Sequence, residues 1–313
     1  MGSSGADWTT ITQWLGVAWQ WTAQIVSSHF FESGLVALLG AFFGAKIAQG
    51  TAARNKFRDD LTKEIRDTNA AIALSSAICN SVLNLKRQHL LSRKTSFDKQ
   101  KTDFLDFERK RATGEAQGNK PYELRVDFRF LPVLKMPTDK LQAHVLDRLS
   151  VIGRPLNLAV QIAEASVALN DATEDLNDQI KGFQAEKGPR DRTFLALYFG
   201  LPSGNGEVDE IYATTLSAMA LQSDCLIYFT DLLCSDLKEH GDELLSVYKK
   251  RLGGKSVLAI TSANFASSKA DKLFPPENDF SSWHTAFVKR QKPISFLARA
   301  KRFLRVKRVS ASS

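Results

Sequence analysis

Residues 61–82 read LTKEIRDTNAAIALSSAICNSV. One set of positions steps through this stretch by alternating fours and threes: Leu61, Ile65, Thr68, Ile72, Ser75, Cys79 and Val82. That spacing brings every member to one face of an α-helix and is typical of a helix-bundle or coiled-coil seam. Because Thr68 and Ser75 are small and polar, we expect close packing or buried hydrogen bonds along the seam.

The same periodicity predicts helices along most of the chain. One should run without a breaker from Thr51 to about Leu91, and another should begin at Thr138 or Asp139 and end at Gly153. Longer seams predict helices from Pro155 to about Lys187 and from Val208 to about Leu252. Long helices joined by short connections pack as antiparallel bundles, so we expect a mainly α fold.

Residues 122–130 break the helical period. Apolar Leu124, Val126, Phe128 and Phe130 alternate there with charged residues, which is the pattern of a β-strand with one buried face. The other plausible strand is 256–261, directly after Gly253-Gly254. A lone strand leaves its main-chain polar groups without partners, so we expect these two to pair as a small β element.

Residues 30–49 read FFESGLVALLGAFFGAKIAQ, which is the length that crosses a bilayer as a helix. Glu32 and Lys46 stand near its two ends, where their charges can reach the interfaces. We therefore expect a transmembrane helix at 30–49. The uninterrupted apolar part, Gly34–Ala45, is only 12 residues long, so a buried core helix remains the alternative.

The residues on either side of 30–49 suggest an orientation. Arg54, Lys56, Arg58 and Lys63 follow it, whereas residues 1–29 contain no Lys or Arg. The positive-inside rule then places the chain as a single-pass protein of the plasma (inner) membrane, with its N-terminus outside and its C-terminal domain in the cytoplasm. Residues 8–28 are uncharged and hold four of the five tryptophans, which suits an interfacial helix on the outer side. A second span is the alternative for that segment.

Within 30–49, Gly40 and Gly44 form a GxxxG pattern that Ala48 extends. Small residues four apart let two helix backbones approach closely in lipid. We expect self-association through Gly40, Gly44 and Ala48, and hence a homo-oligomer.

The positive charge is concentrated at the C-terminal end. Residues 289–313 contain nine basic residues and no acidic one, so residues 1–288 hold 33 basic against 34 acidic residues. From Ile294 onward, apolar residues share one helical face and basic residues mostly occupy the other. We expect a basic amphipathic helix that contacts anionic lipid through the following residues: Arg299, Lys301, Arg302, Arg305, Lys307 and Arg308. A disordered tail or a nucleic-acid-binding tail are the alternatives, and nucleic acid is not the partner we expect.

These features divide the chain into four parts. They are an extracytoplasmic Trp-rich segment (1–29), the membrane helix (30–49), a cytoplasmic helical domain (50–288) and the basic tail (289–313).

No common catalytic or cofactor motif is present. The three cysteines, Cys79, Cys225 and Cys234, form no CxxC pair, so they suggest buried free thiols. Asp236, His240 and Glu243 share a helix face, but bundle di-iron sites carry a Glu three residues before the His, whereas Glu243 follows His240, and they repeat the set on a second helix. We expect no metal or other cofactor.

The sequence therefore favours a membrane-tethered helical scaffold or regulatory module that self-associates and binds a protein partner. A membrane-acting stress or phage-defence effector, whose assembly perturbs the bilayer, is the first alternative. An enzyme whose dispersed site forms no recognisable motif is the second.

Overall fold

The computed structural model describes residues 29–115, 121–185, 191–204, 206–253, 258–263, 265 and 271–283, with only the backbone described for residues 29–36 and 271. Helices dominate this part of the chain, and none of its residues forms a strand. The chain divides into two units, residues 1–61 and 62–313, and the helix bundle belongs to the second.

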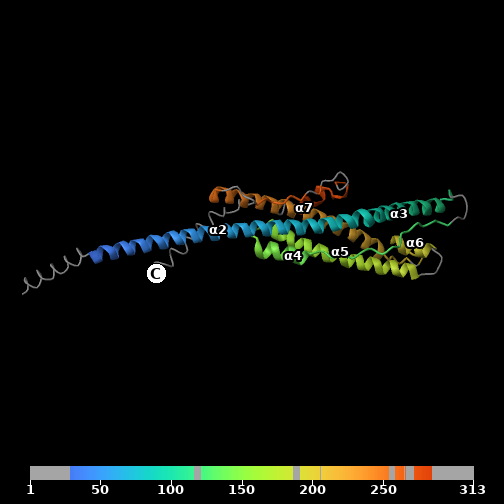
Figure 1. Cartoon of the computed structure of the whole chain (residues 1–313). Coiled ribbons are helices and arrows are strands. Elements are labelled where there is room, and N and C mark those ends of the chain that lie inside the picture. The colour runs from blue at the N-terminus through green and yellow to red at the C-terminus, as the bar shows by residue number, and fades with distance from the viewer. Residues whose placement is uncertain are drawn as a thin grey trace, which may run out of the picture. The chain divides into compact units, whose positions relative to one another are not determined.

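Figure 1 shows the helices in chain order, with the long connection 113–137 between the third and the fourth of them. Helix α2 (His29–Leu85) leads through one π-helical turn, η1 (Lys86–Leu90), directly into α3 (Leu91–Ala112). The remaining elements are α4 (Thr138–Ala143), the π-helical turn η2 (His144–Arg148), α5 (Arg154–Ala185), α6 (Arg192–Phe199), α7 (Ile211–Leu252) and the 3₁₀ turns η3 (Asp271–Leu273) and η4 (Glu277–Phe280). The helix expected to reach Gly153 thus ends at Arg148.

Helices α5 and α7 lie side by side and run antiparallel (Figure 1). Arg154 at the start of α5 pairs with Asp236 in the second half of α7, while Phe183 near the end of α5 meets Tyr212 at the start of α7. The bundle part of α2 is also antiparallel to α7, because Glu64 contacts His240 whereas Lys86, just after α2, contacts Asp224. The predicted long-helix antiparallel bundle is therefore confirmed.

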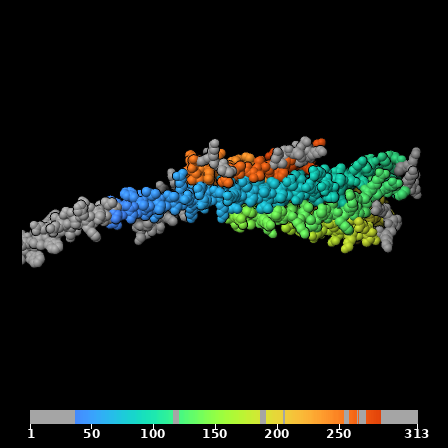
Figure 2. All heavy atoms as spheres, viewed as in Figure 1, coloured from blue at the N-terminus to red at the C-terminus, as the bar shows by residue number. Residues whose placement is uncertain are grey.

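The seams predicted from the sequence form the core. All seven positions in 61–82 are buried, and so are seven positions of α5: Ile162, Ser166, Leu169, Thr173, Leu176, Ile180 and Phe183. The polar members are satisfied within the core, since Ser75 Oγ donates to the Thr230 carbonyl at 3.0 Å and Thr68 Oγ1 to the Glu64 carbonyl at 2.8 Å. In the space-filling view, the green atoms of α4 and early α5 lie directly along the blue and cyan atoms of α2 (Figure 2).

One end of the bundle is closed by aromatic rings around α6. Asp191 begins this helix by accepting hydrogen bonds from the N–H groups of Thr193 and Phe194, both at 3.0 Å. Gly200 ends it with a φ of 64°, and a Cβ there would lie 3.2 Å from the Glu210 Cα, so this turn requires glycine. The rings in mutual contact here are those of Phe97, Phe104, Phe128, Phe183, Phe194, Tyr198, Phe199 and Tyr212.

The two-stranded element predicted from 122–130 and 256–261 is not found in the part of these segments that the structure describes, whose residues belong to no strand. The alternation itself holds as far as Phe128, because the side chains of Leu124, Val126 and Phe128 are half-buried while the residues between them are exposed. It shifts afterwards, where Phe130 is 55% exposed and Leu131 only 3%.

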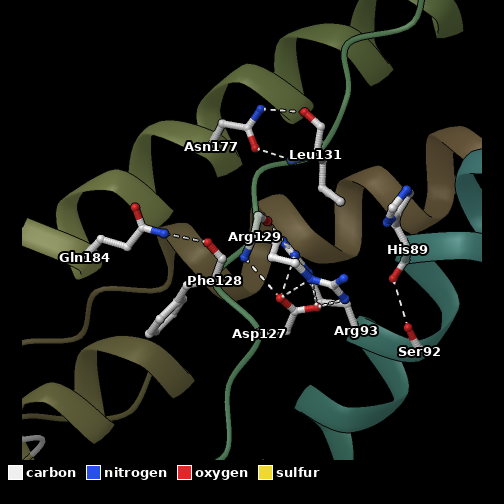
Figure 3. Close-up of polar contacts among 9 residues, drawn as sticks. All are labelled: His89, Ser92, Arg93, Asp127, Phe128, Arg129, Leu131, Asn177 and Gln184. Atoms are coloured by element: carbon white, nitrogen blue, oxygen red, sulfur yellow. Dashed lines mark hydrogen bonds and ion pairs between the residues drawn. The ribbon is translucent and has the colours of Figure 1, made fainter.

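Side-chain amides take the place of a neighbouring strand for residues 121–137. Gln100 accepts from the Arg125 N–H at 2.8 Å and donates to the Arg125 carbonyl at 2.7 Å. Asn177 likewise accepts from the Leu131 N–H at 2.7 Å and donates to the Leu131 carbonyl at 2.8 Å (Figure 3). Asn170 accepts from the Leu134 N–H at 3.1 Å and donates to the Leu134 carbonyl at 3.0 Å. Each amide supplies both the acceptor and the donor that one residue's main chain needs, so Arg125, Leu131 and Leu134 are satisfied without a partner strand.

Among the described residues, no helix combines the length and hydropathy needed to cross a bilayer, so the span expected at 30–49 is not found. The interfacial segment expected at 8–28 lies outside the described residues.

Candidate functional site

Helix α2 carries an apolar segment, residues 37–49, whose side chains are all exposed, as are those up to residue 56. The exposed fraction reaches 72% for Leu38, 63% for Phe42 and 69% for Ile47. Soluble proteins expose single apolar residues freely, but a contiguous exposed apolar surface marks a site that contacts another molecule or a membrane.

The large and small side chains of the apolar segment divide between two halves of the helix. At about 100° per residue, the large ones fall within one half; they are Leu38, Leu39, Phe42, Phe43 and Ile47. The opposite half carries the small residues Ala37, Gly40, Ala41, Gly44, Ala45 and Ala48. A Cβ added at Gly40 or Gly44 would meet no atom within 4 Å. The residues predicted for self-association therefore share an open, small-residue face.

The predicted lipid-contact residues of the tail, from Arg299 to Arg308, lie outside the described residues. Their role stays a prediction.

A polar cluster joins α2 to α7 and to the chain after η2. His240 Nε2 lies 3.1 Å from Glu64 Oε1, and Ser150 donates to the same oxygen through its N–H at 2.9 Å and its hydroxyl at 2.5 Å. Burial raises the pKa of Glu64, but the hydrogen bonds from His240 and Ser150 outweigh it, so that pKa lies below its ordinary value. A carboxylate held ionised in this way tethers three parts of the fold.

A second histidine–carboxylate contact lies three residues along α2. His144 Nδ1 and Arg148 Nη1 each lie 3.7 Å from Asp67 Oδ1. The buried atoms Asp67 Oδ2 and His144 Nδ1 have no hydrogen-bond partner among the described residues. This contact is thus looser than the Glu64–His240 pair.

The Asp236, His240 and Glu243 set considered from the sequence does not converge. Asp236 pairs with Arg154, His240 pairs with Glu64, and Glu243 is exposed. Within the described ranges, no group of three or more His, Cys, Asp or Glu side chains is placed to hold a metal ion. Spacing along one helix could not reveal this, because the partners come from α2 and α5.

A buried guanidinium lies beside the 121–137 segment. The Arg93 side chain is only 6% exposed, its Nη2 donates to the Arg129 carbonyl at 2.7 Å, and Asp127 stands 4.0 Å away (Figure 3). Hydrogen bonding from Arg129 and the nearby Arg93 charge lower the pKa of Asp127 to about 2. Arg93 Nε and Nη1 find no hydrogen-bond partner in the described part of the chain. Arg93 of α3 thus contacts this segment through the Asp127 carboxylate and the Arg129 carbonyl.

The three cysteines differ in burial. All three are free, Cys79 and Cys234 are buried, and burial raises the pKa of Cys79 to about 12. The interpretation as buried free thiols is therefore confirmed for Cys79 and Cys234. With so high a pKa, the Cys79 thiol is a poor nucleophile at neutral pH.

An open cavity of about 960 Å³ lies beside the connection from α6 to α7. Its lining includes Thr193, Ser203 and the acidic residues Glu207, Asp209 and Glu210. The two histidine–carboxylate contacts do not line it, so this cavity and those titratable groups do not combine into one site.

Comparison with known protein families, with characterised proteins and with solved structures finds no match for this chain.

Proposed function

We propose that this protein is a membrane-tethered helical scaffold that self-associates through its apolar segment and binds a protein partner. The observation that carries the proposal is the exposure of the apolar side chains of the apolar segment, among them Leu38, Phe42 and Ile47. A helix that is apolar on all sides is stable when lipid or other helices surround it, not when water does. The buried bundle seams favour a scaffold over an enzyme, and so does the lack of a converging catalytic cluster in the part of the chain that the structure describes.

The division of the apolar segment supports insertion together with self-association. The half with Leu38, Phe42 and Ile47 is suited to acyl chains, and the half with Gly40 and Gly44 is suited to close contact with a second helix. The uninterrupted apolar run is short. A short run is accommodated when a flanking lysine such as Lys46 reaches the headgroups, and when helices associate.

The charges that follow support an orientation with the bundle in the cytoplasm. Arg54, Lys56 and Arg58 come directly after the segment and are exposed. Basic residues are retained on the cytoplasmic side during insertion. An activity reporter fused after Ser313 should then work only in its cytoplasmic form, and activity of an extracytoplasmic reporter would reverse the orientation.

Membrane attachment is tested by fractionating cells that express the full chain. We expect the wild-type protein in the membrane pellet, resistant to high salt and released by detergent. The Leu38→Arg/Phe42→Arg variant should shift to the soluble fraction, because each arginine near the centre of a span costs about 3 kcal/mol.

The matched control is Val160→Arg/Val167→Arg, which adds the same charge at two exposed valines of α5. It should stay in the pellet. If the wild-type protein is itself soluble and only its oligomer depends on Leu38 and Phe42, the segment pairs with other copies in water and the membrane tether is refuted.

A further inference from the structure

Helix α5 carries a second regular stripe of side chains, on the side opposite its buried seam. Its positions step by alternating fours and threes, as the seam positions do, yet every one of them is exposed: Val160, Glu164, Val167, Asp171, Glu174 and Asp178. At about 100° per residue, they fall within about 80° of the helix circumference. We call this stripe the acidic face of α5, a helix that lies along one edge of the bundle (Figure 1).

The four carboxylates of the acidic face have no basic partner within the described part of the chain. Glu164 accepts a hydrogen bond from the neutral Gln161 side chain at 2.9 Å, and no ion pair there involves any of the four acidic side chains. Lys181 is the single basic residue of α5 besides Arg154, which pairs with Asp236. The acidic face therefore attracts a basic partner.

Two valines alternate with the acidic residues at a spacing of one heptad. Val160 is 36% exposed and Val167 is 60% exposed. Single exposed valines are common on soluble proteins, but these two lie on the same helix line as the carboxylates. An apolar line flanked by charges is how one helix of a coiled coil meets a partner helix of opposite charge. The acidic face thus suits an amphipathic helix that carries basic residues beside its apolar ones.

The chain itself contains a segment with the complementary pattern, residues 294–308. No acidic residue occurs from Lys289 to the C-terminus, and Leu297, Ala300 and Leu304 recur at helical spacing among the basic residues. As a helix, this segment would be about 21 Å long, against about 27 Å for the acidic face. Charge, apolar spacing and length therefore agree between the two.

The described chain ends close enough for this contact. The Trp283 ring packs on Phe229 of α7 with centroids 5.0 Å apart, and α7 lies beside α5. Residues 284–293 can span about 33 Å when extended, which exceeds the combined width of about 20–24 Å of two neighbouring helices. A segment tethered in this way reaches an effective concentration on the order of millimolar, so a weak contact is enough.

We propose that the acidic face of α5 binds the basic tail of the same chain, residues 294–308, and that anionic lipid competes with α5 for this tail. The inference goes beyond the proposed membrane tether, because the contact forms inside one chain. Its test measures that contact and not membrane attachment, so either proposal can fail alone.

Site-specific photo-cross-linking of the full chain in neutral detergent tests the contact. Benzoylphenylalanine in place of Val167 should cross-link to residues 294–308, which peptide mass spectrometry identifies. The matched control is benzoylphenylalanine in place of Leu221, which is 58% exposed and lies on α7, the helix that Trp283 contacts. The control yield should be at least about fivefold lower, because a docked tail spends most of its time on α5. Equal yields would refute the proposal.

Charge reversal separates docking from general attraction. Asp171→Lys/Glu174→Lys should lower the Val167 cross-link at least about fivefold, because attractions on the acidic face become repulsions. Asp242→Lys/Glu243→Lys makes the same change in net charge at two exposed positions of α7 and should leave the yield unchanged. If the two variants give equal yields, the acidic face does not hold the tail. The comparison of Val167 with Leu221 needs neither variant, so it decides the question even if one of them misfolds.

Two further outcomes identify what occupies the acidic face. In a mixture of isotopically light and heavy chains, each cross-link should join parts of one chain. Cross-links between light and heavy chains would assign the tail to a second copy and overturn the proposal.

Phosphatidylglycerol added to the micelles should lower the Val167 yield, whereas phosphatidylcholine should not, because the anionic lipid attracts the same basic residues. A yield that phosphatidylglycerol leaves unchanged would overturn the proposed competition.

Discussion

Single amide side chains bind the main chain of residues 121–137. Asn177 satisfies both main-chain groups of Leu131, a residue buried to 3% exposure. A buried N–H or carbonyl without a partner costs about 1–3 kcal/mol. The amides of α3 and α5 are thus structural residues, although each looks like an ordinary polar surface residue in the sequence.

Replacing Asn177 by leucine should lower the free energy of unfolding by about 2 kcal/mol, because both Leu131 groups lose their partner. Urea unfolding followed by circular dichroism measures the change. The control is Asp178→Leu, which places the same side chain at the exposed neighbouring position of α5. Equal unfolding midpoints for the two variants would contradict the bridging role of Asn177.

Glu64 makes the stability of the bundle depend on pH in a defined direction. Its pKa in the folded protein lies below the ordinary value of 4.5, where hydrogen bonds from His240 and Ser150 outweigh the opposing effect of burial. The folded state therefore gains stability from the ionised carboxylate above the unfolded pKa. That gain disappears as the pH falls through the lower, folded-state pKa.

The Glu64→Gln variant should be less stable than the wild-type protein by about 1–2 kcal/mol at neutral pH, since bonds to a charged acceptor are stronger. The difference should shrink below about pH 4.5. Urea unfolding across this range measures it, with the exposed Glu174→Gln as a control. A difference that stays constant down to acid pH would show that ionised Glu64 does not stabilise the fold.

At the scale of elements, α2 combines two different kinds of helix. From Leu61 onward, its apolar and small residues are buried at the seam spacing, whereas residues 37–56 are exposed on every side. The first arrangement is stabilised by packing within this chain. The second arrangement is the one on which the proposed membrane tether rests.

Gly40→Ile and Gly44→Ile should each weaken self-association of the apolar segment by about tenfold, because a branched side chain separates the two helix backbones. A new Cβ at either glycine meets no atom of the same chain within 4 Å, so the effect should not come from misfolding. Phe42→Ile introduces the same side chain on the opposite half of the helix as a control. A bacterial two-hybrid assay of residues 30–56 measures association. If the glycine variants give the same signal as the wild-type segment, the small-residue face does not mediate self-association.

At the scale of the whole molecule, charge is distributed very unevenly. The formal charge of +8 arises from residues 289–313, which contain nine basic residues and no acidic one, since the charges of residues 1–288 nearly cancel. Clustered basic residues gain about 1 kcal/mol each near an anionic membrane. A chain already tethered to the same membrane would need only weak affinity for this contact.

A peptide of residues 294–308 should bind vesicles that contain anionic lipid and become helical on binding. Added salt should weaken the binding, because screening shortens the reach of the charges. A peptide with serine at the six tail positions named above is the control. Binding to RNA at low salt without binding to anionic vesicles would replace the lipid interaction with a nucleic-acid one.

Much of the fold could be predicted from the sequence alone. Positions such as Leu61, Ile72 and Cys79 are buried as their spacing predicted, since apolar periodicity follows directly from which helix face leaves water. The helix end near Gly253 also follows a local rule, because glycine adopts the positive φ there without strain. For the candidate site, the sequence identified Gly40, Gly44 and Ala48 as one helix face, and their role in self-association stays a prediction.

The partners of polar groups were decided only by the tertiary structure. The alternation at 122–130 indicates that one face of the segment is buried, but it does not tell which groups hydrogen-bond to its main chain. In the structure, Gln100 and Asn177 make such hydrogen bonds in place of a second strand. In the same way, His240 shares a helix face with Asp236 but pairs with Glu64 from α2. Helix periodicity is a property of consecutive residues, whereas hydrogen-bond partners depend on which distant elements pack together, and only the folded chain determines that.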